Sequence, residues 1–158
     1  MSRPIPACSG SFRSGGAIYN VVHRNLYKVH QRVAATFRQG GVFLAGDSAH
    51  VNNSIGGFGL YGGIHEAMEP VDTLHQVIAK QADDTLLDRY TRRRRTLNIE
   101  FVQEQTIKNK KRLEERDPKA REARFDELRA IAEDPAKHKE FLLRTSLIAS
   151  VRRARSMA

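Results

Sequence analysis

The sequence predicts a helix-rich α+β fold, in which a few strands at about residues 17–46 precede four to five helices. β-branched and aromatic residues with partial alternation are concentrated in residues 17–46, which is typical of strands. From about residue 60 to residue 155, apolar residues recur at roughly helical spacing. Two Asp-Pro pairs in this second part are typical of helix starts, because Asp caps the helix and Pro fits its first turn.

The strand region follows residues 1–16, a Ser- and Gly-rich stretch that we expect to be a flexible leader. The strand candidates share branched or aromatic side chains; they are Ile18, Val21, Val22, Tyr27, Val29 and Val33. Gly40-Gly41 predicts a turn, and the apolar run that starts at Val42 predicts a buried strand. That strand would carry Asp47 to its carboxyl end.

The last part of the chain, residues 116–158, is expected to form a helical hairpin tail. Asp117-Pro118 and Asp134-Pro135 predict helices at about 118–132 and 135–153. Each has one apolar face, made by Phe125, Leu128 and Ile131 in the first and by Phe141, Leu142, Thr145, Ile148 and Val151 in the second.

The most informative segment lies between these regions, where Gly46-Asp47 is followed by the glycine-rich run Gly56-Gly57-Phe58-Gly59 and an apparent helix. In open α/β sheets, ligands bind beyond the carboxyl end of a strand and before a helix start. The free N–H groups of a helix start bind anions, and a carboxylate accepts hydrogen bonds from hydroxyls. The pattern favours a ligand with sugar hydroxyls and an anionic part.

The same segment resembles the Gly-Asp signature of class A FAD-dependent aromatic hydroxylases. The corresponding stretches here are Ala45 to His50, Gly56 to Tyr61, Gly63 to Ala67, and the later Tyr90 to Arg95. The resemblance covers about residues 27–113. It implies that residues 17–115 are the carboxyl-terminal part of an FAD-binding monooxygenase domain, and that the fold is a fragment of an FAD/NAD(P)-binding fold.

The resemblance also implies an FAD site and a reaction, the hydroxylation of a small aromatic substrate with NADPH or NADH as reductant. Asp47 would hydrogen-bond the ribityl chain, and the amides near Leu60 and Tyr61 would face the pyrimidine edge of the flavin. His50 is expected to be a structural hydrogen-bonding residue. No catalytic acid or base and no specific substrate are implied. The expected cofactor-binding residues are Gly46, Asp47, Ser54, Gly56, Gly57, Gly59, Leu60 and Tyr61.

A Gly-x-Gly-x-x-Gly turn after a strand, which would hold the dinucleotide phosphates, is missing from the sequence. We therefore interpret the chain as the carboxyl-terminal portion of a hydroxylase: a truncated product, half of a split enzyme, or an excised fragment. An amino-terminal half or a homo-oligomer would be its partner. We expect weak FAD binding or none by the chain alone, and a strand-turn-helix without any ligand remains the alternative.

The composition argues against disulfides, metal sites and membrane spans. The single cysteine, Cys8, excludes an internal disulfide, and the six histidines lack metal-ligand spacing, so we expect no metal site. No apolar run approaches the roughly 18 residues that span a bilayer. The first residues lack a hydrophobic signal core, so we expect a cytoplasmic protein.

The net charge of +9 supports a competing hypothesis, a basic helical interaction module that binds nucleic acid or an acidic protein partner. Its basic clusters are Arg92 to Arg95, Lys108 to Arg112 and Arg152 to Arg155. Acidic residues lie among these clusters at helical spacing, which favours ordinary solvated helix faces over nucleic-acid binding.

Pro70 predicts an interruption in the helix that follows the glycines. Inside a helix, proline removes a hydrogen-bond donor and disfavours helical angles at the preceding residue, here Glu69. We therefore expect two helices, at about 60–69 and 71–80.

Overall fold

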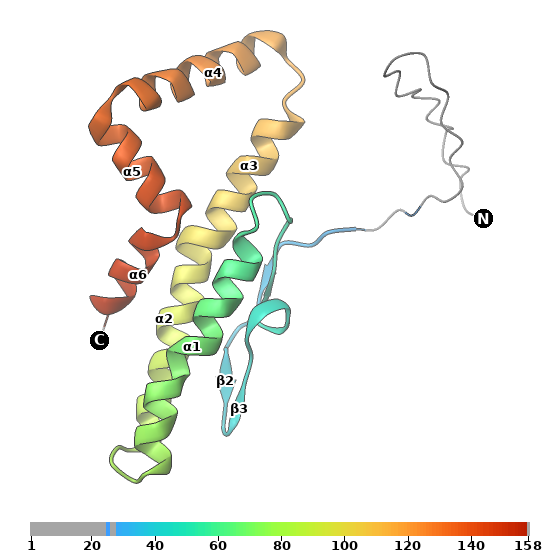
Figure 1. The fold of residues 1–158 in the computed structure, drawn as a ribbon. Helices are drawn as coiled ribbons and strands as arrows, with labels where there is room; N and C mark the ends of the chain where they lie inside the picture. Colours follow the sequence, from blue (N-terminus) through green and yellow to red (C-terminus); the bar gives the residue numbers. More distant parts are fainter. Residues whose placement is uncertain (1–24, 26–27, 158) are drawn as a thin grey trace, which may run out of the picture.

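The computed structural model describes residue 25 and residues 28–157, and its architecture confirms a helix-rich fold with few strands (Figure 1). The strands are β1 (Arg32–Val33), β2 (Arg38–Gln39), β3 (Val42–Phe43) and β4 (His50–Val51). The α-helices are α1 (Phe58–Ile78), α2 (Asp88–Leu97), α3 (Glu104–Glu114), α4 (Pro118–Glu133), α5 (Pro135–Thr145) and α6 (Ile148–Arg155). Two 3-10 turns, Gly46–Ser48 and Asp84–Leu87, and one π-helical segment, Asn98–Gln103, complete the described elements.

The strands form two separate antiparallel pairs. In one pair β1 lies against β4, with Val33 opposite His50, and in the other β2 and β3 form a hairpin whose turn is Gly40-Gly41, as expected. The expected buried strand at Val42 is wrong, because β3 pairs only with β2 and the Val42 side chain is 65% exposed. Val29, another strand candidate, lies outside any strand. The expected leader and the strand candidates at residues 18–22 and 27 lie outside the described residues.

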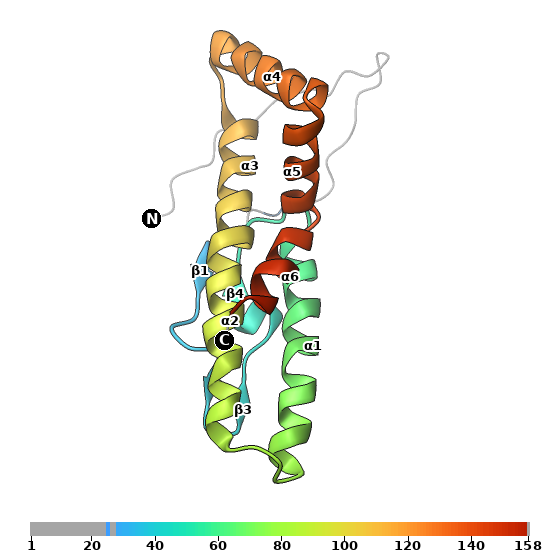
Figure 2. The same cartoon turned by 90° about the vertical axis from the view of Figure 1, so that its left-hand side faces the viewer.

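The helical part is built on two long antiparallel helices (Figure 2). One is α1, and the other is the continuous helix formed by α2, the π-helical segment and α3. The turn between them is capped by Asp83, whose side chain accepts a hydrogen bond from the Thr85 amide. The strand pairs lie beside these helices, and the Gly46–Ser48 turn packs against α1.

Two small apolar clusters hold these layers together. The first joins α1, the long second helix and α6, and it consists of Phe58, Leu97, Phe101, Val102, Leu147 and Ala154. The second joins the strand region to α2 and consists of Phe37, Ala49 and Tyr90. Ala49 of the second cluster follows the Gly46–Ser48 turn directly, and the turn packs against α1, so the expected site is built on packed elements rather than on a free loop.

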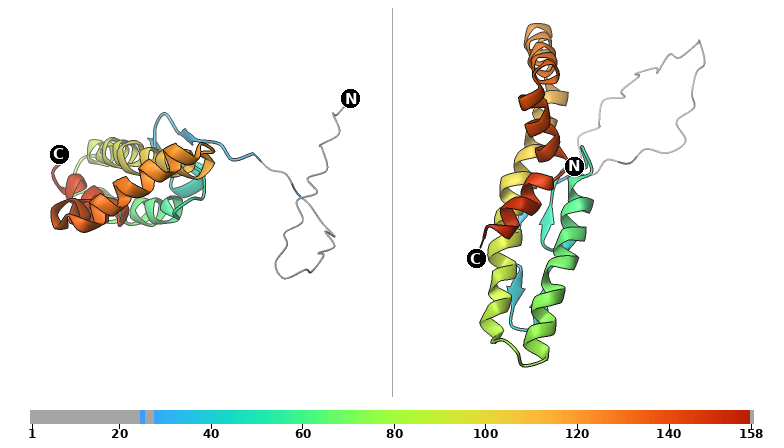
Figure 3. Two further views of the ribbon diagram at one scale, coloured as in Figure 1. Left: turned by 90° about the horizontal axis from the view of Figure 1, so that it is seen from above. Right: turned by 60° about the vertical axis from the view of Figure 1, so that its left-hand side comes forward.

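The carboxyl-terminal helices begin where the Asp-Pro pairs predict. The Asp117 side chain accepts a hydrogen bond from the Lys119 amide, and Asp134 accepts from Ala136 and Lys137. Figure 3 shows α4 leading away from the end of α3 before α5 turns back towards α6.

The single helix expected at 135–153 is wrong, because the chain breaks at Leu147 between α5 and α6. Leu147 has a left-handed φ of 61°, which is costly for a residue with a branched side chain. Its side chain is only 3% exposed in the first apolar cluster. Burial of this leucine therefore compensates for its backbone conformation and redirects α6 onto α2.

The expected break at Pro70 is also wrong. The helix α1 continues through Pro70 from Phe58 to Ile78, and Thr73 donates a hydrogen bond to the Pro70 carbonyl oxygen across 2.9 Å. The fixed φ of proline is itself compatible with a helix, so the cost is limited to a lost donor and a local clash. Packing of α1 against the Gly46–Ser48 turn and the second long helix outweighs that cost.

Candidate functional site

The candidate site centres on the 3-10 turn Gly46–Ser48, which connects β3 to β4 beside the first turns of α1. Gly46 has a φ of 59°, a left-handed conformation that favours glycine. A Cβ atom on Gly63 would lie 3.2 Å from the Gly46 Cα atom, so the helix approaches this turn more closely than most side chains allow. The two glycines thereby place the turn directly on α1.

Asp47 is exposed at the middle of this turn. It lines a hollow of about 260 Å³ together with Lys28, Val29, His30, Val51 and Asn52. The hollow combines this carboxylate with a basic and an amide side chain, which can bind hydroxyl groups of a ligand.

The glycine run forms the entry to α1. Gly56 and Gly57 have φ values of 96° and 70°, and Gly57 is the N-cap residue without any side-chain cap. The first amide N–H groups of a helix have no partner within it, so this start is open to an acceptor. Leu60 and Tyr61 are 70% and 55% exposed on the first turn. Gly59 and Ser54 flank the same entry, and the Ser54 carbonyl oxygen accepts from the Gly57 amide across 3.2 Å.

The loop before the glycines is fixed to α3 by Asn53, which sequence reasoning did not single out as a binding or anchoring residue. Its buried side chain donates to the Thr106 carbonyl oxygen across 2.9 Å and accepts from the Ile55 amide across 3.2 Å. Gln31 accepts from the Asn53 amide and donates to the Thr106 hydroxyl. These contacts join residues up to 75 positions apart, so no local sequence signal indicates them.

A buried acidic residue, Glu66, lies behind the turn. Its Oε2 atom accepts a hydrogen bond from the Gly46 amide across 2.9 Å and lies 3.2 Å from Nε2 of His50. Neither side chain has any exposed surface. His50 thus has the structural hydrogen-bonding role expected from the sequence, and Glu66 is its partner.

Two further buried polar residues, Arg94 and Asn98, lie one helical turn apart on the second long helix. Burial lowers the pKa of Arg94, and the negative charges of Glu66 and Glu69 oppose this shift. Burial also lowers the pKa of His65, and the Arg94 charge adds to that effect. The buried Arg94 therefore lies near three ionisable residues of α1, namely His65, Glu66 and Glu69.

The basic run Arg92 to Arg95 is largely engaged in the fold. Arg93 binds Glu69 and the carbonyl oxygen of Met157, and Arg95 donates to the Ala34 carbonyl oxygen across 3.0 Å. Arg94 is buried, which leaves Arg92 exposed. The run is therefore a structural element and a poor phosphate-binding surface.

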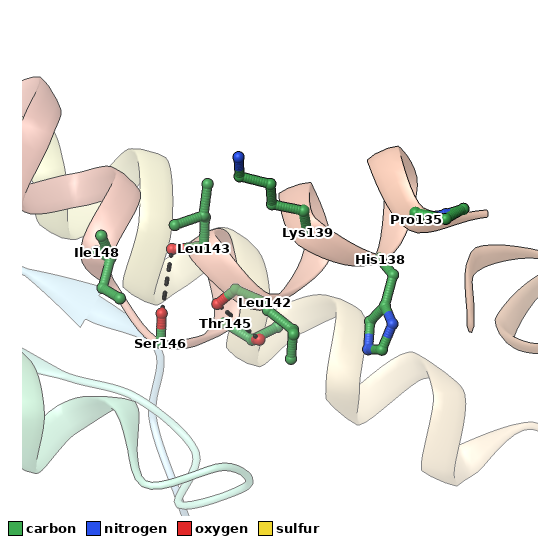
Figure 4. A pocket seen from close by; sticks show the side chains of 8 residues that line it. All are labelled: Pro135, His138, Lys139, Leu142, Leu143, Thr145, Ser146 and Ile148. Carbon is green, nitrogen blue, oxygen red and sulfur yellow. Dashed lines mark hydrogen bonds between the residues drawn. The ribbon is translucent and has the colours of Figure 1, made fainter. Parts of the chain in front are cut away.

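Another hollow, of about 700 Å³, lies on α5 and the start of α6 (Figure 4). Four of its eight lining residues are aliphatic, and Figure 4 shows His138 and Lys139 extending to opposite sides of the helix. The hydroxyls of Thr145 and Ser146 donate to backbone carbonyl oxygens within α5. This hollow lacks the convergent polar groups that ligand sites use.

Two other kinds of site are absent from the part of the chain that the structure describes. Its His, Cys, Asp and Glu side chains form no group of three that could hold a metal ion. None of its helices combines the length and apolarity that a membrane crossing requires.

Comparisons with known proteins identify the family of the chain. A family model described as "FAD binding domain" matches residues 14–105. The chain is 41% identical over 128 residues to para-nitrophenol 4-monooxygenase of Pseudomonas sp. (strain WBC-3), covering 79% of this chain and 31% of that protein. It is 39% identical over 100 residues to 6-hydroxy-3-succinoylpyridine 3-monooxygenase HspB of Pseudomonas putida, covering 63% of this chain and 25% of the relative.

A solved structure, p-nitrophenol 4-monooxygenase PnpA from Pseudomonas putida DLL-E4, has the same fold over the matched part. The TM-score is 0.69 at 38% identity, covering 74% of this chain and 30% of that one. The chain thus spans about a third or less of the length of these relatives.

Proposed function

This chain belongs to the FAD-binding domain family, and we propose that it forms one side of the FAD site of a flavin-dependent aromatic monooxygenase. The observation that carries the proposal is the exposed Asp47 carboxylate on a turn that packs against the first turns of α1. A carboxylate accepts hydrogen bonds from the hydroxyls of a ribityl chain, and an uncapped helix start stabilises negative charge. The turn and the glycine run provide both features.

The residues have separate roles in this proposal. Asp47 holds the ribityl chain, while the amides near Leu60 and Tyr61 face the pyrimidine edge of the flavin. Gly56, Gly57 and Gly59 allow the backbone to approach the cofactor closely. Bound FAD supplies the oxygen chemistry, with NADPH or NADH as the reductant.

The proposed substrate is a small aromatic ring. Its support comes from the names of the relatives, which describe monooxygenases and hydroxylases of para-nitrophenol, 6-hydroxy-3-succinoylpyridine and 3-(3-hydroxy-phenyl)propionate. In this proposal residues 17–115 carry the cofactor side, and the helices within residues 116–158 form a tail attached to it. In the same proposal, the residues that contact the substrate lie in a part of the hydroxylase outside this chain.

An exposed apolar stripe on α1 supports a further polypeptide partner. Tyr61, Ile64, Met68, Val71 and Ile78 follow one another at intervals of three, four, three and seven residues, and each is 48–77% exposed. An exposed apolar stripe of this extent is typical of an interface. We propose that the amino-terminal part of a hydroxylase, or a second copy of the chain, covers it. Light scattering during gel filtration distinguishes the two, since a monomer excludes the second copy.

Titration of the purified chain with FAD, followed by flavin fluorescence, tests the cofactor site. We expect saturable but weak binding, because the sequence has no Gly-x-Gly-x-x-Gly turn for the phosphates. Asp47→Ala removes the acceptor for the ribityl hydroxyls and should abolish this binding. Asp134→Ala, a matched change at the start of α5, should leave it unchanged.

Either of two results contradicts the proposal. Tight stoichiometric flavin would show that the site is complete without a further polypeptide. Equal FAD binding by the Asp47→Ala and parent chains would show that the turn does not contact the cofactor.

A further inference from the structure

The Asp47 turn rests on a carboxylate that has no exposed surface. Glu66 lies on α1, and its Oε2 atom accepts the hydrogen bond of the Gly46 amide across 2.9 Å. Gly46 is the first residue of the turn and immediately precedes Asp47. The contact therefore reaches the backbone next to the proposed cofactor-binding side chain.

The same carboxylate also fixes the other end of the turn. The Nε2 atom of His50 lies 3.1 Å from Oε1 and 3.2 Å from Oε2 of Glu66, and His50 begins β4 just after the turn. A Cβ atom on Gly62 would lie 3.5 Å from this ring nitrogen, so the imidazole is packed against the α1 backbone. One buried side chain thus holds both ends of the segment that carries Asp47.

Burial of Glu66 costs more free energy than burial of an apolar side chain of similar size. A buried carboxylate loses its hydration, and this loss is compensated only by hydrogen bonds and nearby positive charge. Here the Gly46 amide, His50 and the neighbouring Arg94 provide that compensation. Other buried side-chain atoms near them have no hydrogen-bond partner among the described residues, namely His50 Nδ1, Arg94 Nε, and Nδ2 and Oδ1 of Asn98. An apolar side chain would avoid the desolvation of the carboxylate, but it would leave the Gly46 amide and His50 Nε2 without their partner.

We propose that Glu66 is a positioning residue for cofactor binding, which holds the Gly46 amide and His50 so that Asp47 projects into the hollow beside β4. The inference rests on the proposed FAD site. It means that the buried Glu66 determines the position of the exposed Asp47 carboxylate. It requires an acceptor oxygen at this position, whereas the side-chain volume alone is insufficient.

Amide hydrogen exchange of the parent chain, followed by NMR, tests the contact without any cofactor. We expect the Gly46 amide to be strongly protected, although the adjacent Asp47 is exposed. Glu66→Leu keeps the approximate volume and removes the acceptor, so the protection should fall by about tenfold or more. Glu66→Gln keeps an acceptor oxygen and should restore it. An unprotected Gly46 amide in the parent chain would overturn the proposal even if Glu66→Leu did not fold.

FAD titration of the same variants separates positioning from general stability. We expect Glu66→Leu to weaken FAD binding by about tenfold or more, and Glu66→Gln to bind like the parent. Thr73→Val is the control, because it removes a buried hydroxyl of α1 that bonds only to the Pro70 carbonyl oxygen. It should change neither FAD binding nor the Gly46 amide.

The two readouts fail separately. Absence of FAD binding by the parent chain contradicts the proposed function, while the exchange of Gly46 still decides whether Glu66 holds the turn. If Glu66→Leu retains both the protection and the FAD affinity, Glu66 has no positioning role.

Discussion

The phenolic hydroxyl of Tyr90 donates a hydrogen bond to the carbonyl oxygen of Leu44 across 2.7 Å, which ties α2 to the segment leading into the Asp47 turn. The Tyr90 ring packs against Phe43 and Phe37, with centroid separations of 5.6 and 6.3 Å. Burial raises the pKa of Tyr90 well above its ordinary value, so the hydroxyl stays a donor even in moderately alkaline solution. The helix α2 therefore supports the segment before the candidate site, in addition to the contact of α1 with the turn.

Tyr90→Phe removes this hydrogen bond and leaves the Leu44 carbonyl oxygen without its partner. We expect the free energy of unfolding to fall by about 1–2 kcal/mol, as measured by urea denaturation. Tyr61→Phe is the matched control, since the Tyr61 side chain is 55% exposed, and it should change stability by less than about 0.5 kcal/mol. Equal effects of the two substitutions would show that the Leu44 contact contributes nothing.

Gly56 is the first residue of the glycine run, and its backbone conformation is unfavourable for every other residue type. Its φ is 96°, and an added Cβ atom would lie 2.5 Å from Cε2 of Phe58, a core residue of the first cluster. Gly56→Ala should therefore destabilise the protein by more than about 1 kcal/mol, measured as a loss in the midpoint of thermal or urea unfolding. A neutral result would mean that the loop adopts another conformation.

Gly41→Ala provides the comparison for that substitution. Gly41 has no left-handed φ, and an added Cβ atom would meet no atom within 4 Å. We expect a change within about 0.5 kcal/mol, with a slight gain because alanine restricts the unfolded chain.

The parts of the fold that depend on local chemistry were predictable from the sequence. The starts of α4 and α5 follow from Asp-Pro pairs, and the β2–β3 turn follows from Gly40-Gly41. The break at Leu147 was not predictable, because it depends on burial of that side chain in a cluster formed by distant helices. The continuity of α1 through Pro70 depends in the same way on tertiary packing.

The candidate site shows the same division. Asp47 and the glycines were recognisable because the motif is continuous in sequence. The support of the turn by Glu66 and the anchoring of Asn53 on Thr106 join residues 20 and 53 positions apart. Such contacts require the three-dimensional arrangement of α1 and α3.

The half-buried His65 makes stability depend on pH. Burial lowers the pKa of His65 in the folded protein. As the pH falls below the ordinary histidine pKa of about 6.5, the unfolded chain therefore binds more protons than the folded protein. The contribution of neutral His65 is present above that pH and is lost as the pH falls. Between about pH 7.5 and 5.5, the parent chain should thus lose more stability than His65→Gln in urea denaturation. His75→Gln, a change at an exposed residue of the same helix, should follow the parent, and parallel curves for all three would contradict this prediction.

The arginine run should not make the chain a nucleic-acid-binding protein. Arg93 and Arg95 are held by Glu69, Met157 and Ala34, so few charges of the run can neutralise phosphates. We expect at most weak binding to a random DNA duplex at physiological ionic strength, measured by fluorescence anisotropy. Any binding at low salt should fall steeply as salt is raised. Submicromolar affinity at physiological salt would instead support the basic interaction module.

Pro70→Ala tests whether α1 is continuous in solution. The substitution restores one helical hydrogen-bond donor and removes a ring clash, which together cost roughly 3 kcal/mol inside a helix. The buried ring carbons that it removes offset part of this gain, so we expect a net stabilisation of about 1–2 kcal/mol. The circular dichroism signal at about 222 nm should stay unchanged, because the helix already includes residue 70. Val71→Ala, at an exposed neighbour, should gain at most about 0.7 kcal/mol from helix propensity. A clear rise in helical signal on Pro70→Ala would show that the helix breaks at Glu69 after all.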